Sequence, residues 1–235
     1  MTDQPLSREE RVRHVAEAHK FEAEARKLNA EAAAAEAVAR VSEIDALKRE
    51  RTEREELTAD KYYHTYYFTS SVSEASVRMC VGALSQWHRL DSDCEMKIVF
   101  TSPGGSVIDG MVLFDFIQEM RRAGHYITTD TLGMAASMAG ILLQAGDHRI
   151  MHREAWVLIH EGSFGAGGTV GQVEDTVEWV KKIQQRIIDI FAERCQATSA
   201  PKKLTKAVIK KRWARKDWWL SSAECLDYGL VDEVR

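Results

Sequence analysis

The sequence has few cysteines and prolines, and it contains no long run of apolar residues. Its four cysteines, at positions 80, 94, 195 and 225, include no CxxC pair and no spacing typical of zinc ligands. No apolar stretch approaches the roughly 20 residues needed to cross a bilayer, and the charged N-terminus has no signal-peptide core. We therefore expect a cytoplasmic protein with reduced cysteines, no bound metal and no membrane contact.

The chain also lacks a strong excess of charge of either sign. Its 235 residues have a formal net charge of −4 and a pI of about 6.1. This balance gives no electrostatic reason to expect a nucleic acid or an anionic membrane as a partner. The hydrophobic fraction of 45% is typical of a globular protein that buries a sizeable core.

The first 60 residues contain no glycine, and Pro5 is their only proline. They are rich in Ala, Glu, Arg and Lys, which predicts one long helix. Its clearest apolar stripe is thin: Val38, Val41, Ile44 and Leu47. Because such a stripe cannot build a core, we expect residues 1–60 to form a charged helical extension, either solvated or half of a coiled coil with another chain. Residues 61–235 then form the second domain.

From residue 61, apolar or β-branched segments alternate with helical patterns. Such alternation predicts an α/β fold built from repeated βαβ units around a mainly parallel sheet. One helix stands out, because apolar residues recur every three or four positions from Val170 to Ile190. It either packs on its own sheet or reaches a partner subunit. The basic run 201–217 predicts a further helix with a solvated face.

Two residues are candidates for the nucleophile and the base of an acyl-transfer reaction. Ser137 lies between a predicted strand and the apolar run "MAGILL", so it is either a helix cap or a nucleophile at a helix start. In the second case the amide of Met138 is a candidate oxyanion donor. His160 ends the apolar strand "AWVLIH", at the sheet edge where catalytic groups of α/β proteins gather, although a structural histidine fits there too.

A serine hydrolase also needs a second oxyanion donor and a carboxylate that orients the base. The turn "SPGGS" at 102–106 has two glycines after a strand, which leaves amide groups exposed and makes Gly105 a candidate donor. Spacing does not choose the carboxylate. The candidates are Asp175, Asp189, Asp217, Asp227 and Asp232.

Four segments, taken in order, resemble the proteolytic subunit of the Clp ATP-dependent serine protease. They are "TSPGGSVIDGMVLFDFI", "GMAASMAGILLQAG", "WVLIHEG" and "KDWWLSSAECLDYGLVDEV". The resemblance runs from Tyr66 to Arg235 and implies the fold shared by this subunit and the crotonases, with the helix after His160 as the family's handle.

The resemblance also assigns roles to residues. It implies that Ser137 is the nucleophile, His160 the general base and Asp217 the orienting carboxylate. The amides of Gly105 and Met138 fall where the family places its oxyanion hole. The implied activity is a serine endopeptidase that needs no cofactor and no metal.

The implied partners are polypeptide substrates, further copies of the chain in two stacked rings of seven, and a ring ATPase of the Clp type. Some relatives from bacteriophages instead process capsid or scaffold proteins without an ATPase. The chain departs from the family pattern at Glu161, at Trp218 and Trp219, in the long basic run before Asp217, and in residues 1–60. A non-catalytic assembly subunit and a crotonase-type hydratase remain alternatives on the same fold.

Overall fold

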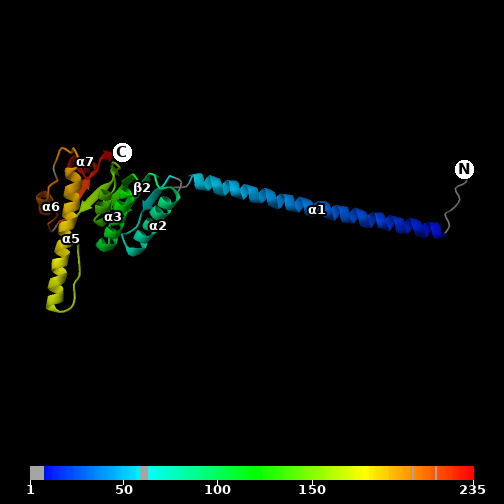
Figure 1. The fold of residues 1–235 in the computed structure, drawn as a ribbon, viewed down its shortest axis with the longest axis horizontal. Coiled ribbons are helices and arrows are strands. Elements are labelled where there is room, and N and C mark those ends of the chain that lie inside the picture. Colours follow the sequence, from blue (N-terminus) through cyan, green and yellow to red (C-terminus); the bar gives the residue numbers. More distant parts are fainter. Residues whose placement is uncertain (1–7, 59–62, 203, 215) are drawn as a thin grey trace. The chain divides into compact units, whose positions relative to one another are not determined.

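The computed structural model describes residues 8–58, 63–202, 204–214 and 216–235 (Figure 1). The chain divides into two compact units, Met1–Ala59 and Asp60–Arg235. None of the helices in the described residues combines the length and apolar character that a membrane span requires.

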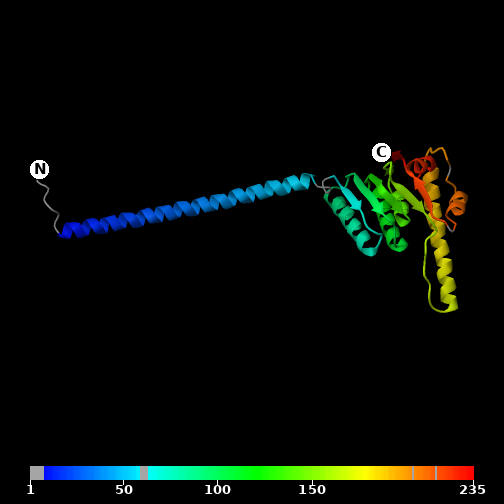
Figure 2. The ribbon, with the colours of Figure 1, turned by 180° about the vertical axis from the view of Figure 1, so that it is seen from behind.

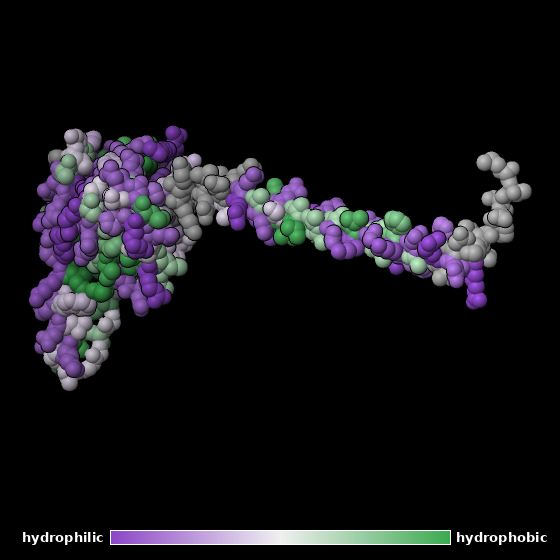
Figure 3. Space-filling model, turned by 45° about the vertical axis from the view of Figure 1, so that its right-hand side comes forward, coloured by the Kyte–Doolittle hydropathy of each residue, from purple (hydrophilic) through white to green (hydrophobic). Residues whose placement is uncertain are grey.

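The first unit holds one helix, α1 (Arg8–Thr58), of 51 residues. Every side chain described in it is exposed, and the stripe from Val38 to Leu47 faces solvent like the rest. Figure 3 shows small hydrophobic areas separated by hydrophilic surface along this helix. Its support is local: good helix formers and ion pairs one turn apart, such as Glu36 with Arg40 at 2.9 Å. The predicted long N-terminal helix is confirmed.

The second unit is built on a sheet that has seven strands within the described residues. They are β1 (Thr65–Phe68), β2 (Met96–Ser102), β3 (Ile127–Ala136), β4 (His148–Met151), β5 (Trp156–Ile159), β6 (Trp218–Ser221) and β7 (Glu233–Val234). Strands β1-β2-β3-β4-β7 are neighbours in that order and run parallel. Strand β5 pairs with β3 in parallel and with β6 antiparallel. The predicted α/β fold with a mainly parallel sheet is confirmed.

Helices connect and cover these strands. They are α2 (Glu74–Leu90), α3 (Val107–Arg122), α4 (Met138–Leu142), the 3₁₀ helix η1 (Leu143–Ala145), α5 (Val170–Gln196), α6 (Lys206–Trp213) and α7 (Ser222–Tyr228). The apolar side of α2 is buried, with Leu84 and Trp87 in the core, and α4 is buried throughout. The capping box of Ser221 with Glu224 begins α7, and Gly229 ends it in the left-handed region at φ 72°.

The long helix α5 belongs to the core only near its C-terminal end. Its buried residues lie between Ile187 and Cys195, whereas Val170 and Trp179 near its start are exposed. Figures 1 and 2 show the N-terminal half of α5 extending beyond the sheet, beside the segment that leads into it. The apolar residues that recur along α5 therefore lie in two environments: those near its C-terminal end are packed in the core, and those near its start are exposed.

Strand β3 positions the candidate site because it pairs with β4 along its first part and with β5 near its C-terminal end. Thr128–Thr131 pair with β4, and Met134–Ala136 pair with β5. The C-terminal ends of β3 and β5 therefore lie side by side, and the residues that follow them, Ser137 and His160, leave the sheet at the same edge. This edge is where parallel sheets carry their functional groups.

Candidate active site

Ser137 has an unusual backbone for a residue with a side chain. It lies between β3 and α4 with φ 54° and ψ −122°, and it is one of two non-glycine residues with positive φ in the described residues. Its amide donates to the Leu158 carbonyl at 3.0 Å, which fixes the turn against β5. Such a conformation costs about 1–3 kcal/mol and persists where surrounding contacts hold it, commonly at functional sites.

The Ser137 hydroxyl is not a helix cap. Its side chain accepts no capping hydrogen bond from α4. Its Oγ instead lies 2.7 Å from His160 Nε2, within hydrogen-bond distance. Of the two interpretations of Ser137 from the sequence, the structure thus excludes capping and leaves a hydroxyl paired with an imidazole, which is the arrangement that activates a serine.

One of the candidate aspartates reaches the same imidazole. Asp217 Oδ1 lies 3.4 Å from His160 Nδ1. This is longer than an ideal N–H···O hydrogen bond, and the Asp217 side chain is 64% exposed, so water competes for it. Contacts of this kind are often long when no substrate is bound.

Three of the other four aspartates form ion pairs elsewhere. Asp189 binds Lys206 at 2.8 Å, Asp227 binds Lys202 at 2.7 Å, and Asp232 binds the buried Arg149. Asp175 is exposed on α5. Asp217 is adjacent to His160 because β5 and β6 pair antiparallel, with Ile159 opposite Trp218.

The two backbone amides of the predicted site belong to Met138 and Gly105. Met138 is the first residue of α4, where an amide has no carbonyl of its own helix to donate to. In the turn after β2, Gly104 donates to Ser102 Oγ and Ser106 donates to the Val72 carbonyl. Within the described residues, no acceptor is found for the amide of Gly105, which lies between them.

Gly104 brings this turn into contact with the serine. Its φ is +87°, and a Cβ at this position would lie 2.5 Å from the Ala136 carbonyl oxygen and 2.7 Å from Ser137 Cβ. Only glycine fits there, because the added atom would meet rigid backbone. The turn therefore packs directly on Ser137, and Gly105 follows it in the chain.

We expect Gly104→Ala to lower the free energy of unfolding by about 2–3 kcal/mol, through left-handed strain plus the clash with Ser137. Gly133→Ala is the matched control, because Gly133 also has positive φ (69°) but would meet only Thr101 Cγ2, at 3.8 Å. Gly133→Ala should lower the free energy of unfolding by only about 1 kcal/mol. Urea denaturation of both variants measures the difference, and equal losses would contradict the close packing of the turn on Ser137.

A groove of about 300 Å³ adjoins these groups. Its walls come from the turn after β2, the start of α3, the loop after β5, α5 and the end of α6, and they include Ile108, Phe164, Trp179, Ile183 and Trp213. A smaller cavity of about 20 Å³ beside Ser137 shares Val107, Gly162 and Ile187 with the groove. Ser137, Met138 and His160 line the small cavity, and Gly105 lines the apolar groove beside it.

The described residues hold no group of three or more His, Cys, Asp or Glu side chains arranged to bind a metal ion. All four cysteines are buried as free thiols, and burial raises the pKa of Cys195 to about 12. These thiols are poor nucleophiles because the thiolate is the reactive form.

The sequence pattern of one protein family, Clp protease, matches residues 58–235. This is more than half of the chain. The chain belongs to the Clp protease family.

Curated relatives agree, and three are ATP-dependent Clp protease proteolytic subunits. That of Bacteroides fragilis is 32% identical over 149 residues, or 62% of this chain and 66% of the relative. That of Bacteroides thetaiotaomicron is 31% identical, covering 62% of each chain. Subunit 1 of Leifsonia xyli subsp. xyli is 33% identical over 147 residues, covering 62% and 69%. The match spans slightly less than two thirds of the length of the Bacteroides relatives.

The sequence did not reveal what holds the turn in this member of the Clp protease family. Ser102 is buried and donates to the Ser70 carbonyl at 2.6 Å while it accepts from Gly104. Val72 exchanges two backbone hydrogen bonds with the turn, from its amide to Gly104 and from Ser106 to its carbonyl. In the sequence, the only feature that points to these contacts is Ser102, the first residue of "SPGGS". No sequence feature predicts the role of Val72, because that role depends on contact between segments about 30 residues apart.

Proposed function

We propose that this chain is a serine endopeptidase that hydrolyses peptide bonds by acyl transfer to Ser137. The observation that carries the proposal is the 2.7 Å contact between Ser137 Oγ and His160 Nε2. Ser137 lies in a turn with positive φ, and its hydroxyl does not cap the following helix. Membership of the Clp protease family supports the same activity.

Each group has one task in the proposed reaction. Ser137 Oγ attacks the peptide carbonyl carbon while His160 Nε2 takes the hydroxyl proton and then delivers it to the leaving amine. Asp217, near Nδ1, keeps the imidazole in the tautomer with its free lone pair on Nε2 and stabilises the imidazolium. The amides of Gly105 and Met138 donate to the oxyanion. A water molecule, deprotonated by His160, then hydrolyses the acyl-enzyme.

The proposed function also includes assembly of the chain with further copies and with a partner protein. The exposed N-terminal half of α5 supports assembly into a homo-oligomer, with rings as the expected form, because Val170 and Trp179 leave apolar surface open in the single chain. The names of the curated relatives, ATP-dependent Clp protease proteolytic subunits, support an ATP-dependent partner of the Clp type and polypeptide substrates.

Labelling with a fluorophosphonate, which reacts with activated serines, tests this function. We expect the full-length protein to be labelled and Ser137→Ala to stay unlabelled, because only an activated hydroxyl attacks the phosphorus atom. Heat-denatured wild-type protein is the control for nonspecific reaction. Equal labelling of wild type and Ser137→Ala would reject Ser137 as the nucleophile. A folded but unlabelled wild type would favour a non-catalytic assembly subunit.

A further inference from the structure

A basic cleft lies between α6, β6 and α7, with a volume of about 760 Å³. Its cations are Lys202, Lys211, Arg212 and Lys216. Asp217 is the only acidic residue among those that line it within the described part of the chain. The cleft is therefore locally basic, although the whole chain carries a net charge of −4.

Most of this charge is available to a ligand. The Arg212 guanidinium lies over the Trp218 ring, 5.8 Å from its centroid, and a contact through the ring face leaves N–H donors for an anion. Lys211 and Lys216 are exposed. Lys202 is partly neutralised by its 2.7 Å ion pair with Asp227, and the Glu224 carboxylate interacts electrostatically with Lys202 and Arg212.

The cleft opens next to the proposed catalytic residues. Lys216 and Asp217 line it and also line a second cavity, of about 540 Å³, that holds His160. Asp217 is the carboxylate that lies 3.4 Å from His160. A polypeptide that occupies the cleft can therefore continue into the cavity lined by His160.

We propose that this basic cleft binds an acidic segment of the polypeptide substrate, and so favours substrates with Asp- and Glu-rich stretches near the cleaved bond. This inference rests on the proposed peptidase function. The cations come from three successive segments, with Lys202 before α6, Lys211 and Arg212 near the end of α6, and Lys216 after it. An extended chain with carboxylates every few ångströms matches this spread, whereas a single small anion meets only one or two of the cations.

Binding can be measured without hydrolysis, on full-length Ser137→Ala protein. The probes are two fluorescein-labelled peptides of equal length, one rich in Glu and one with Gln at the same positions, followed by fluorescence anisotropy at low salt. We expect the Glu peptide to bind about tenfold more tightly than the Gln peptide, because exposed charge pairs each add modestly and weaken with salt.

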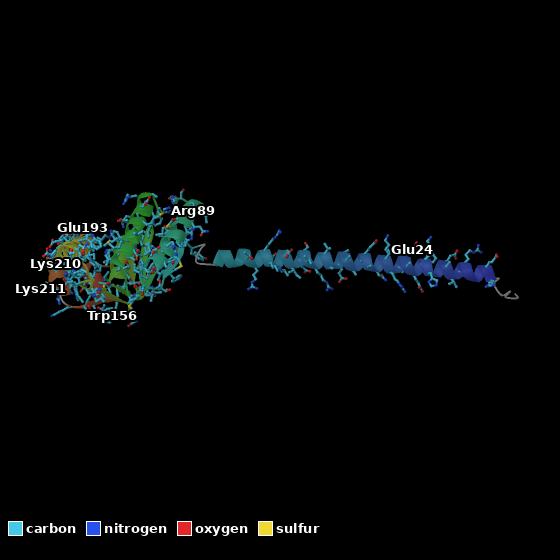
Figure 4. All side chains as sticks on the ribbon, turned by 90° about the horizontal axis from the view of Figure 1, so that it is seen from below. Glu24, Arg89, Trp156, Glu193, Lys210 and Lys211 are labelled. Atoms are coloured by element: carbon cyan, nitrogen blue, oxygen red, sulfur yellow. The ribbon has the colours of Figure 1, made fainter. Side chains whose placement is uncertain are left out.

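Substitutions locate the binding surface. Adding Lys211→Gln and Arg212→Gln to the Ser137→Ala background should weaken binding of the Glu peptide by about five- to tenfold. The matched control is Arg89→Gln with Arg122→Gln, which removes the same charge from exposed residues at the ends of α2 and α3 that do not line the cleft. Figure 4 shows Arg89 on the opposite side of the domain from Lys211. This control should change affinity less than about twofold, because the interaction between two charges weakens with the distance between them. Lys211→Arg with Arg212→Lys should retain binding.

Three results would overturn the proposal. They are equal affinity for the Glu and Gln peptides, equal losses in the cleft and control variants, and complete displacement by inorganic phosphate at constant ionic strength, which would mark a small-anion site. If the Ser137→Ala protein fails to bind the Glu peptide while the wild type reacts with fluorophosphonate, the cleft alone is rejected. If the Ser137→Ala protein binds the Glu peptide as expected but the wild type does not react with fluorophosphonate, the peptidase function is rejected instead.

Discussion

Ser137→Ala and His160→Ala are each expected to lower kcat for peptide hydrolysis by about 10⁴- to 10⁶-fold. Their contact of 2.7 Å makes them one functional unit, since the hydroxyl is a weak nucleophile unless the imidazole takes its proton. The double variant should therefore be no slower than the worse single variant, within about threefold. Initial rates on a fluorogenic peptide, at saturating substrate, measure all three.

Ser92→Ala is the control, because Ser92 is exposed in the turn between α2 and β2 and lies far along the chain from both residues. It should keep the wild-type rate. Losses that multiply in the double variant would mean that Ser137 and His160 act independently, which contradicts their proposed roles as nucleophile and base. Unchanged circular dichroism in each variant excludes unfolding as the cause.

Asp232→Ala is expected to lower the free energy of unfolding at pH 7 by about 3–5 kcal/mol, because it leaves a buried guanidinium uncompensated. The Arg149 side chain is 1% exposed. Asp232 accepts from Arg149 Nη2 at 2.6 Å, from Nε at 3.0 Å and from its backbone amide at 2.8 Å. Urea denaturation of the full-length protein measures the loss.

The same pair predicts a pH dependence. Burial alone would raise the pKa of Asp232, but its hydrogen bonds and ion pair with Arg149 outweigh burial and hold the pKa below its ordinary value. A carboxylate with a lowered pKa in the folded state stabilises the fold above its unfolded-state value of about 4, and this stabilisation is lost as pH falls through the folded-state pKa. The difference between wild type and Asp232→Ala should therefore be constant from pH 7 to 5 and shrink below about pH 4.

Glu178→Ala is the matched control, since Glu178 pairs with Lys181 on the exposed side of α5. Exposed pairs contribute little, so its effect should stay below about 0.5 kcal/mol. A loss for Asp232→Ala no greater than that of Glu178→Ala would mean that Arg149 finds water or another acceptor when Asp232 is removed.

Local rules in the sequence were enough to predict the elements. Helix formers without glycine produce α1, and the capping box at Ser221 with Gly229 determines both ends of α7. The alternation of strand and helix patterns predicted the mainly parallel sheet. These signals succeed because they act over a few residues and do not depend on distant parts of the chain.

The sequence alone placed Ser137 at a strand-to-helix turn and His160 at a strand end, but it could not separate a cap from a paired hydroxyl. Only the tertiary structure decided this, by showing no capping bond and the 2.7 Å contact across 23 residues. It likewise selected Asp217 as the neighbour of His160, because the antiparallel pairing of β5 with β6 brings residues far apart in sequence together. Long-range strand pairing leaves no local signature, so composition and spacing determined the elements, and the fold determined which of their side chains meet.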